Sequence, residues 1–234
     1  MKLGIIIPNV GMNEEQIEER RVFLDRFSSC DTQIVMVKNE QGPLSIESEF
    51  EHEQGSVEIV KTIMKLNDQG FDAFIPWCGG DPGVVAARER SPIPVIGPFQ
   101  SSCAIATVLG FKFSIITPAT NPRLIESRLR AIGLREKLAS IRQLKMAVLD
   151  VRKDLPKTIL ILEEECQKAV SEDGADAIIL GCMALFGVTG ELNKRIHVPI
   201  IDPALAAVSM AESVVKMKLT HSPLAYPFPK DKNG

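Results

Sequence analysis

The cysteines of this chain lack the pattern of a disulfide framework or a structural zinc site. Five cysteines are an odd number, none of them forms a CxxC pair, and only three histidines could act as partners. Disulfide-rich domains carry even numbers of cysteines, and structural zinc sites use closely spaced pairs. Neither class is predicted, nor is any metal site, so each thiol needs its own explanation.

Long runs of one kind of residue are also missing. The 27 basic and 30 acidic residues give a net charge of −3, and the sequence has no long basic run. It therefore lacks the basic surface expected of a nucleic-acid-binding protein. Apolar stretches such as residues 104–109 are far shorter than the ~20 residues of a membrane span, and residues 1–8 are too short for a signal peptide. With 45% hydrophobic and 24% charged residues, the sequence predicts a globular cytoplasmic protein without a nucleic-acid or membrane partner.

Short β-branched runs alternate with longer stretches of helical spacing. The expected strands are residues 3–7, 33–37, 73–77, 95–96, 113–117, 147–149, 177–180 and 199–201. This alternation predicts an α/β fold of parallel sheets with helices on both faces. Two of the helices have clear start signals. Asn13 precedes Gln16 in a capping-box pattern, and Asn121 precedes Pro122 in a helix that Gly133 is suited to end.

Three sequence blocks recur in the same order along the chain. Residues 2–8 read like residues 112–118, residues 70–78 like 174–182, and residues 94–98 like 199–203. Such self-similarity indicates a duplication. We therefore predict two pseudosymmetric, open parallel-sheet halves. The first half comprises residues 1–100 plus 205–234, and the second half comprises residues 101–204.

Two cysteines occupy equivalent positions in this repeat. Cys78 and Cys182 each follow the strand of the second block directly. Ligands of open parallel sheets bind beyond the carboxyl ends of the strands. If the halves face each other about a pseudo-twofold axis, the two sulfurs face each other across the cleft between them. The cleft is therefore the predicted active site.

Two opposed thiols can invert a stereocentre. One cysteine as a thiolate removes a proton from one side of a carbon, and the other as a thiol delivers a proton from the opposite side. Asp81 followed by Pro82 resembles a helix start, and a helix N-terminus close to Cys78 is expected to lower the pKa of that thiol. No such signal follows Cys182.

Glycines accompany both thiols. Gly79, Gly80 and Gly83 follow Cys78, and Gly181 precedes Cys182, so backbone N–H groups can approach a developing enolate-like oxygen or a carboxylate. These glycines lack the GxGxxG and GxxxxGK[ST] spacings, which argues against dinucleotide or nucleotide binding. No cofactor is therefore predicted.

Several other residues have simpler explanations. Cys30, Cys103 and Cys166 are interpreted as small buried hydrophobes. Trp77 is interpreted as a packing residue more than as a substrate platform, and His52, in an acidic stretch, as a solvated side chain.

The two cysteine motifs resemble those of a known superfamily. Cys78 opens the run Cys-Gly-Gly-Asp-Pro-Gly, and Cys182 stands in Gly-Cys-Met. Together with Pro8-Asn9 after the first strand, these motifs are similar to those of the aspartate/glutamate/hydantoin racemase superfamily, above all its hydantoin racemase branch. The resemblance extends over residues 2–215.

This resemblance implies a cofactor-independent enzyme that acts on a small molecule, with Cys78 and Cys182 as its acid/base pair. It also implies that Asn9 and Thr117, at matched strand ends, hydrogen-bond the substrate. Further backbone and binding positions carried over by the resemblance are Pro8, Gly79, Gly80, Met183 and Ala184.

The chain also departs from related patterns. Glutamate racemases carry a histidine directly after the second cysteine, where this chain has Met183, which favours the hydantoin branch. That branch usually has Asn-Pro-Asn where this chain has Ile7-Pro8-Asn9, and a glutamate where it has Gln100.

We therefore expect proton abstraction next to a carbonyl, in a hydantoin-like or amino-acid-derived substrate. The alternatives are an aspartate or glutamate racemase, a maleate cis-trans isomerase, an arylmalonate-type decarboxylase and, as a different class, a non-catalytic two-lobed binding protein. Assembly into a homo-oligomer is compatible with the sequence.

Overall fold

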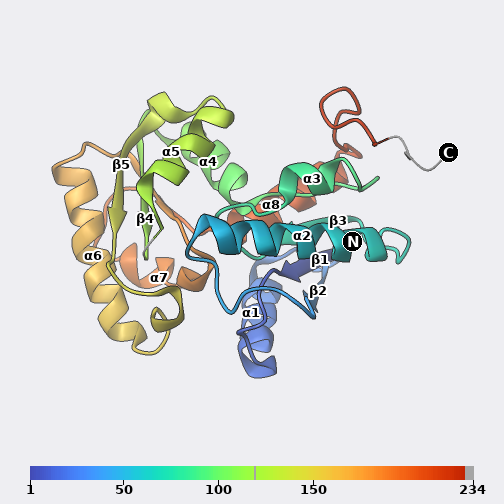
Figure 1. Cartoon of the computed structure of the whole chain (residues 1–234). Helices are drawn as coiled ribbons and strands as arrows, with labels where there is room; N and C mark the ends of the chain where they lie inside the picture. Colours follow the sequence, from blue (N-terminus) through green and yellow to red (C-terminus); the bar gives the residue numbers. More distant parts are fainter. Residues whose placement is uncertain (119, 230–234) are drawn as a thin grey trace.

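The computed structural model describes residues 1–118 and 120–229, which form two parallel β-sheets (Figure 1). The first sheet has the order β2-β1-β3, and the second sheet has the order β5-β4-β6-β7. The strands of the first sheet are β1 (Lys2–Ile7), β2 (Gln33–Lys38) and β3 (Ala73–Pro76). Those of the second sheet are β4 (Phe113–Thr117), β5 (Leu138–Gln143), β6 (Ala177–Leu180) and β7 (Ile200–Ile201). The predicted α/β class with two open parallel sheets is confirmed.

The recurring sequence blocks occupy matching places in the two sheets. In the first sheet β1 lies between β2 and β3, and Leu3 pairs with Ala73. In the second sheet β4 lies between β5 and β6, and Phe113 pairs with Ala177 in the same way. The two strands that end in a cysteine, β3 and β6, therefore pair with the equivalent strands β1 and β4.

Helices cover both faces of the first sheet. Leu3, Ile5 and Ile7 of β1 pack with α1 (Glu14–Phe27) and α8 (Pro203–Lys216). Ile6 points to the opposite face and packs with α2 (Glu49–Leu66) and α3 (Val84–Arg88). Successive side chains of a strand point to opposite faces, so these four apolar residues bury both faces of β1.

The second sheet is covered in the same manner. On one face Ile116 and Ile178 pack with α6 (Leu155–Ser171) and α7 (Thr189–Leu192). On the other face Phe113 and Ile115 pack with α4 (Pro98–Leu109) and α5 (Pro122–Ala131).

The helix starts predicted from the sequence are confirmed. The Asn13 side chain accepts from the Gln16 N–H, and the Gln16 side chain accepts from the Asn13 N–H, which completes the capping box of α1. The Asn121 side chain caps α5, with Pro122 at its first position. Gly133 has a φ of 73° just after the end of that helix, a left-handed conformation that glycine adopts without strain.

Two of the predicted strands are wrong. Residues 147–149 do not form a strand, because Val148–Asp150 is a short 3-10 helix. The second sheet is completed instead by β5, which the sequence reading missed. The predicted strand at residues 95–96 is reduced to a single bridge between Val95 and Phe74.

Helices α4 and α8 connect the two sheets. They pack against each other, α4 also covers the second sheet, and α8 also packs against β3 of the first sheet. The tail that follows α8 lies on the first half, where His221 Nε2 accepts from the Val95 N–H at 2.7 Å. The boundaries at residues 100 and 204 stay a prediction. Within the described residues, no helix has both the length and the apolarity needed to cross a membrane.

Candidate active site

The two cysteine loops meet between the sheets. The Cys78 loop (residues 78–83) follows β3, and the Cys182 loop (residues 182–187) follows β6. A Cβ atom added to Gly79 would lie 2.5 Å from the carbonyl oxygen of Gly181 and 3.2 Å from Cys182 Cα. The backbones of the two segments are therefore in contact, and only glycine fits at position 79.

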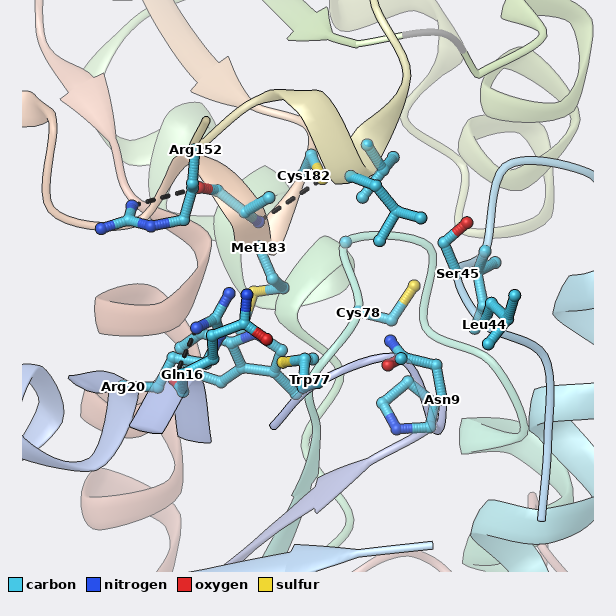
Figure 2. Close-up of a pocket in the computed structure, with 18 of the residues that line it drawn as sticks. Asn9, Gln16, Arg20, Leu44, Ser45, Trp77, Cys78, Arg152, Cys182 and Met183 are labelled. Carbon is cyan, nitrogen blue, oxygen red and sulfur yellow. Dashed lines mark hydrogen bonds between the residues drawn. The ribbon is translucent and has the colours of Figure 1, made fainter. Parts of the chain in front are cut away.

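Both cysteines border one cavity of about 410 Å³ (Figure 2). Its walls come from the loop after β1, helix α1, residues 44–46, both cysteine loops and residues 148–155. Seven of the predicted site residues line this cavity, namely Pro8, Asn9, Cys78, Gly79, Cys182, Met183 and Ala184.

Two predicted site residues lie elsewhere. Gly80 lines a smaller cavity of about 50 Å³ that also contacts Cys78 and Cys182. Thr117 is fully buried, donates a hydrogen bond to Thr120 Oγ1 at 3.2 Å, and lines neither cavity. Thr120, three residues further on, does line the smaller cavity, and the strand-end pattern of the sequence does not reveal this.

Burial makes both thiols weaker acids. It raises the pKa of Cys78 to about 11, although the Gly80 N–H and Arg128 lower it in part. Burial raises the pKa of Cys182 to about 12, although the Ala184 N–H, whose nitrogen lies 3.4 Å from the sulfur, lowers it in part. The expected lowering of the Cys78 pKa is therefore wrong.

Asp81 does not have the predicted capping role. It has a φ of 55°, and α3 begins after Gly83, at a φ of 68°. The Asp81 carboxylate instead accepts from the N–H groups of Phe99 at 2.7 Å and Gln100 at 3.0 Å, in the first turn of α4. That helix begins after Gly97, which has no capping side chain, so its free N–H groups need an acceptor from elsewhere. Burial raises the pKa of Asp81 to about 6.

A second aspartate holds the Cys182 loop. Asp202 caps α8 by accepting from the Ala204 N–H at 2.9 Å, and its other oxygen accepts from the Gly187 N–H at 2.8 Å. Burial raises the pKa of this carboxyl as well. Each cysteine loop is thus tied by a buried carboxylate to the N-terminus of a helix.

Arginines approach the cysteines from both halves, and the sequence analysis missed them. Arg20 of α1 is only 5% exposed and lines the larger cavity, next to Arg152. Arg128 of α5 lines the smaller cavity. One signal was available, because Arg20 lies three residues after Ile17 and Arg128 three residues after Ile125, on the apolar faces of their helices.

The described residues that could hold a metal ion are Glu49, His52 and Glu53, whose ligand atoms lie within 4.8 Å of one another. His52 Nε2 already lies 3.0 Å from the carbonyl oxygen of Gly80, and Glu49 accepts from Arg128 at 2.9 Å. The first contact ties α2 to the Cys78 loop, and the second ties α2 to α5. The His52 side chain is 12% exposed, so the prediction of a solvated histidine is wrong.

The remaining thiols and the single tryptophan have the predicted packing roles, with one exception. Cys103 and Cys166 are buried, as predicted, but Cys30 is exposed. Trp77 is 3% exposed and packs edge-on against Phe186, with 5.7 Å between the ring centroids, and it also lines the larger cavity.

A family model described as Asp/Glu/Hydantoin racemase matches residues 7–211. A hydantoin racemase of Pseudomonas sp. (strain NS671) is 35% identical over 234 residues, which cover 99% of this chain and 93% of that protein. A hydantoin racemase of Rhizobium meliloti is 34% identical, over 81% of this chain and 80% of that protein.

Solved structures show the same relationship. The allantoin racemase from Pseudomonas fluorescens superposes with a TM-score of 0.93 at 29% identity, covering 100% of this chain and 99% of that one. A glutamate racemase from Francisella tularensis has a TM-score of 0.65 at 18% identity, over 94% of this chain and 83% of that one, and shares the fold. The chain belongs to the Asp/Glu/Hydantoin racemase family and is a racemase of that superfamily.

Proposed function

We propose that the protein racemises 5-substituted hydantoins, with Cys78 and Cys182 as the acid/base pair. The observation that carries this proposal is that both cysteines, from matching loops of the two halves, border a single cavity. The relatives described above as hydantoin and allantoin racemases support the choice of a hydantoin ring.

The proton transfers occur at C5 of the ring, the carbon next to a carbonyl. One cysteine, as a thiolate, takes the proton from C5, and the negative charge moves onto the carbonyl oxygen. The other cysteine, as a thiol, then delivers its proton to the opposite face of C5. The raised pKa of each thiol makes its thiolate a stronger base toward a weakly acidic C–H bond.

Electrostatic coupling prevents both thiols from being ionised at once. A charge on Cys78 raises the pKa of Cys182 further, so ionisation of one sulfur favours the neutral form of the other. One thiolate opposite one thiol is the combination that inversion requires, and exchange of the two roles allows the reverse reaction.

Polar groups beside the two sulfurs can form hydrogen bonds with the hydantoin ring. Asn9 lines the cavity close to Cys78, and its buried Oδ1 has no hydrogen-bond donor among the described residues (Figure 2). It accepts a hydrogen bond from a ring N–H. The Ala184 N–H is directed to the sulfur of Cys182. Gly79 and Met183 also line the cavity, and we assign their N–H groups to the developing oxyanion.

Deuterium exchange tests the two-base mechanism. Each enantiomer of 5-benzylhydantoin is incubated in D₂O with wild type, Cys78→Ala and Cys182→Ala, and followed by circular dichroism and mass spectrometry. Wild type inverts both enantiomers with exchange at C5. Each variant fails to invert, and each exchanges only the enantiomer whose C5–H faces the remaining thiol. Cys30→Ala, at an exposed cysteine, is the control. Undiminished inversion by either active-site variant contradicts the proposal.

A further inference from the structure

Two arginines occupy equivalent positions in the two halves. Arg20 of α1 and Arg128 of α5 lie the same number of residues after the asparagines that cap their helices, Asn13 and Asn121. Each lines a cavity that the cysteine of the other half also lines. The charge of Arg20 lowers the pKa of Cys182, and that of Arg128 lowers the pKa of Cys78.

The two arginines differ in how their charge is neutralised. Arg128 donates to Glu49 at 2.9 Å in a direct ion pair. The Nη1 of Arg20 donates to the Gln16 carbonyl oxygen, and its nearest carboxylate, that of Glu19, lies 3.8 Å away. Glu19 also accepts from Arg152. Two arginines thus share one carboxylate beside the larger cavity.

Arg20 is the more deeply buried of the two. It is 5% exposed, and its Nε has no hydrogen-bond acceptor among the described residues. Its guanidinium lies 4.9 Å from the ring centroid of Phe186, and Arg152 lies 4.0 Å from the same centroid. Burial, together with the charge of Arg152, lowers the pKa of Arg20 to about 10, which still leaves it charged at neutral pH.

We propose that Arg20 binds an acceptor oxygen on the C5 substituent of the substrate and thereby determines specificity. The preferred hydantoins then carry a carboxylate on the substituent, and a neutral carbonyl oxygen is the weaker alternative. This inference rests on the proposed function.

The shape of the larger cavity directs the C5 substituent of a bound hydantoin toward Arg20. C5 must lie at the two sulfurs, and the larger cavity runs from there past Met183 and Trp77 to Gln16, Arg20 and Arg152 (Figure 2). The charged residues in its lining are Glu19, Arg20 and Arg152, so this wall carries an excess of positive charge. A carboxylate placed there supplies the partner that Arg20 lacks.

The experiment compares three substrates. They are hydantoin-5-acetate, which is anionic, 5-ureidohydantoin, which is a neutral acceptor, and 5-benzylhydantoin, which has no acceptor on its substituent. Values of kcat/KM are measured by circular dichroism for wild type, Arg20→Gln and Arg20→Lys. The control is Arg21→Gln, which removes a charge from the exposed side of the same helix, where Arg21 pairs with Glu18 and Asp25.

In Arg20→Gln, the ratio of kcat/KM for the acetate to that for the benzyl compound falls by about tenfold or more. Arg20→Lys keeps part of the ratio, and Arg21→Gln keeps the wild-type ratio. A fall confined to the acetate identifies charge as the recognised feature, and a matching fall for the ureido compound identifies hydrogen bonding. Either supports the proposal. An equal loss for all three substrates, or an unchanged ratio, overturns it.

Equilibrium binding separates this inference from the proposed reaction. Dissociation constants of hydantoin-5-acetate and 5-benzylhydantoin are measured by calorimetry for the same variants, after thermal melts show that each variant is folded. If wild type racemises none of the three compounds, the proposed function fails. The Arg20 inference is then decided by binding alone: a selective loss of acetate affinity in Arg20→Gln supports it, and equal affinities overturn it.

Discussion

The Cys78 loop and the Cys182 loop descend from the same sequence block, yet they are anchored in opposite directions. In the Cys78 loop the anchoring carboxylate, Asp81, belongs to the loop itself and reaches forward to the first turn of α4. For the Cys182 loop the carboxylate comes from Asp202, the N-cap of α8, and reaches back to the Gly187 N–H. Both loops are thus tied to a helix N-terminus, although the residue that makes the tie differs.

Both halves therefore need a rigidly held cysteine loop, but they use different residues to hold it. An acid/base pair works only if both sulfurs are held in place, and a loop acquires that rigidity from a neighbouring helix. The electrostatic surroundings also diverged. Arg128 beside Cys78 is paired with Glu49, whereas Arg20 beside Cys182 has no direct carboxylate partner at hydrogen-bonding distance among the described residues.

The largest effect is expected where the two loops touch. Gly79→Ala places a Cβ 2.5 Å from the Gly181 carbonyl oxygen, and backbone on both sides leaves little room to yield. The loops must move apart, and a displacement on the order of 1 Å between catalytic groups costs about a hundredfold in kcat/KM. The measurement is kcat/KM for racemisation of a hydantoin.

Gly190→Ala is the matched control. A Cβ at Gly190 in α7 would meet nothing within 4 Å, so its kcat/KM should equal that of wild type. Full activity of Gly79→Ala would mean that contact between the two loops is not needed for catalysis.

The pH dependence of the rate tests whether both thiols are protonated in the free enzyme. The pKa of Cys78 is raised to about 11 and that of Cys182 to about 12, so at neutral pH both are protonated in the free enzyme. The reaction needs one thiolate, and its population grows with pH. We expect kcat/KM to rise about tenfold per pH unit between pH 6 and 8. Initial rates at constant ionic strength provide the test, and a flat profile would show that one thiol is already ionised.

The two aspartate anchors should differ in their contribution to stability. Asp202→Ala leaves the N–H groups of Gly187 and Ala204 without their acceptor, which costs about 1–3 kcal/mol in the free energy of unfolding. Asp81→Ala loses two similar hydrogen bonds, and alanine tolerates the φ of 55° less well than aspartate, so its cost should be somewhat larger. Urea unfolding measures both values.

Asp81→Gly separates the two contributions at that position. Glycine accepts the positive φ without strain, so this variant should be more stable than Asp81→Ala and, because it lacks the two hydrogen bonds, less stable than wild type. If Asp81→Gly is as stable as wild type, the Asp81 carboxylate does not anchor the Cys78 loop.

Much of the fold could be predicted because the halves repeat. The central strands are apolar, their neighbours carry the cysteines, and the repeat fixes which strands correspond. The sequence did not predict β5 (Leu138–Gln143), because this strand has no apolar run. It lies at the edge of the second sheet, where among the described strands it pairs with β4 alone, and its side chains are mostly half-buried. Residues 147–149 are apolar for another reason, since Val148 and Leu149 line the larger cavity.

The site was predictable only in part. Cys78, Cys182 and their flanking residues are local motifs at strand ends, and they do line the cavity. Arg20 and Asp81 were missed or misread because their surroundings depend on contacts between distant segments. Asp81 finds its partners 18 and 19 residues away in α4, and no local pattern distinguishes that contact from a cap of α3.

The smallest effect concerns Arg128, whose charge lowers the pKa of Cys78. Arg128→Gln should raise that pKa, reduce the thiolate fraction at pH 8 and slow alkylation of Cys78 by iodoacetamide by about twofold to threefold. The effect is modest because Arg128 is partly exposed and already paired with Glu49. Mass spectrometry resolves the rates of the two cysteines in a Cys30→Ser background, and the rate of Cys182 should stay the same.

Arg130→Gln, which removes an exposed charge from the same helix, controls for the long-range field. If Arg128→Gln slows both thiols equally, Arg128 acts on the shape of the shared cavity. If only Cys78 slows, the charge of an arginine from the opposite half tunes this thiol, and the helix position that Arg128 shares with Arg20 has a function in the second half.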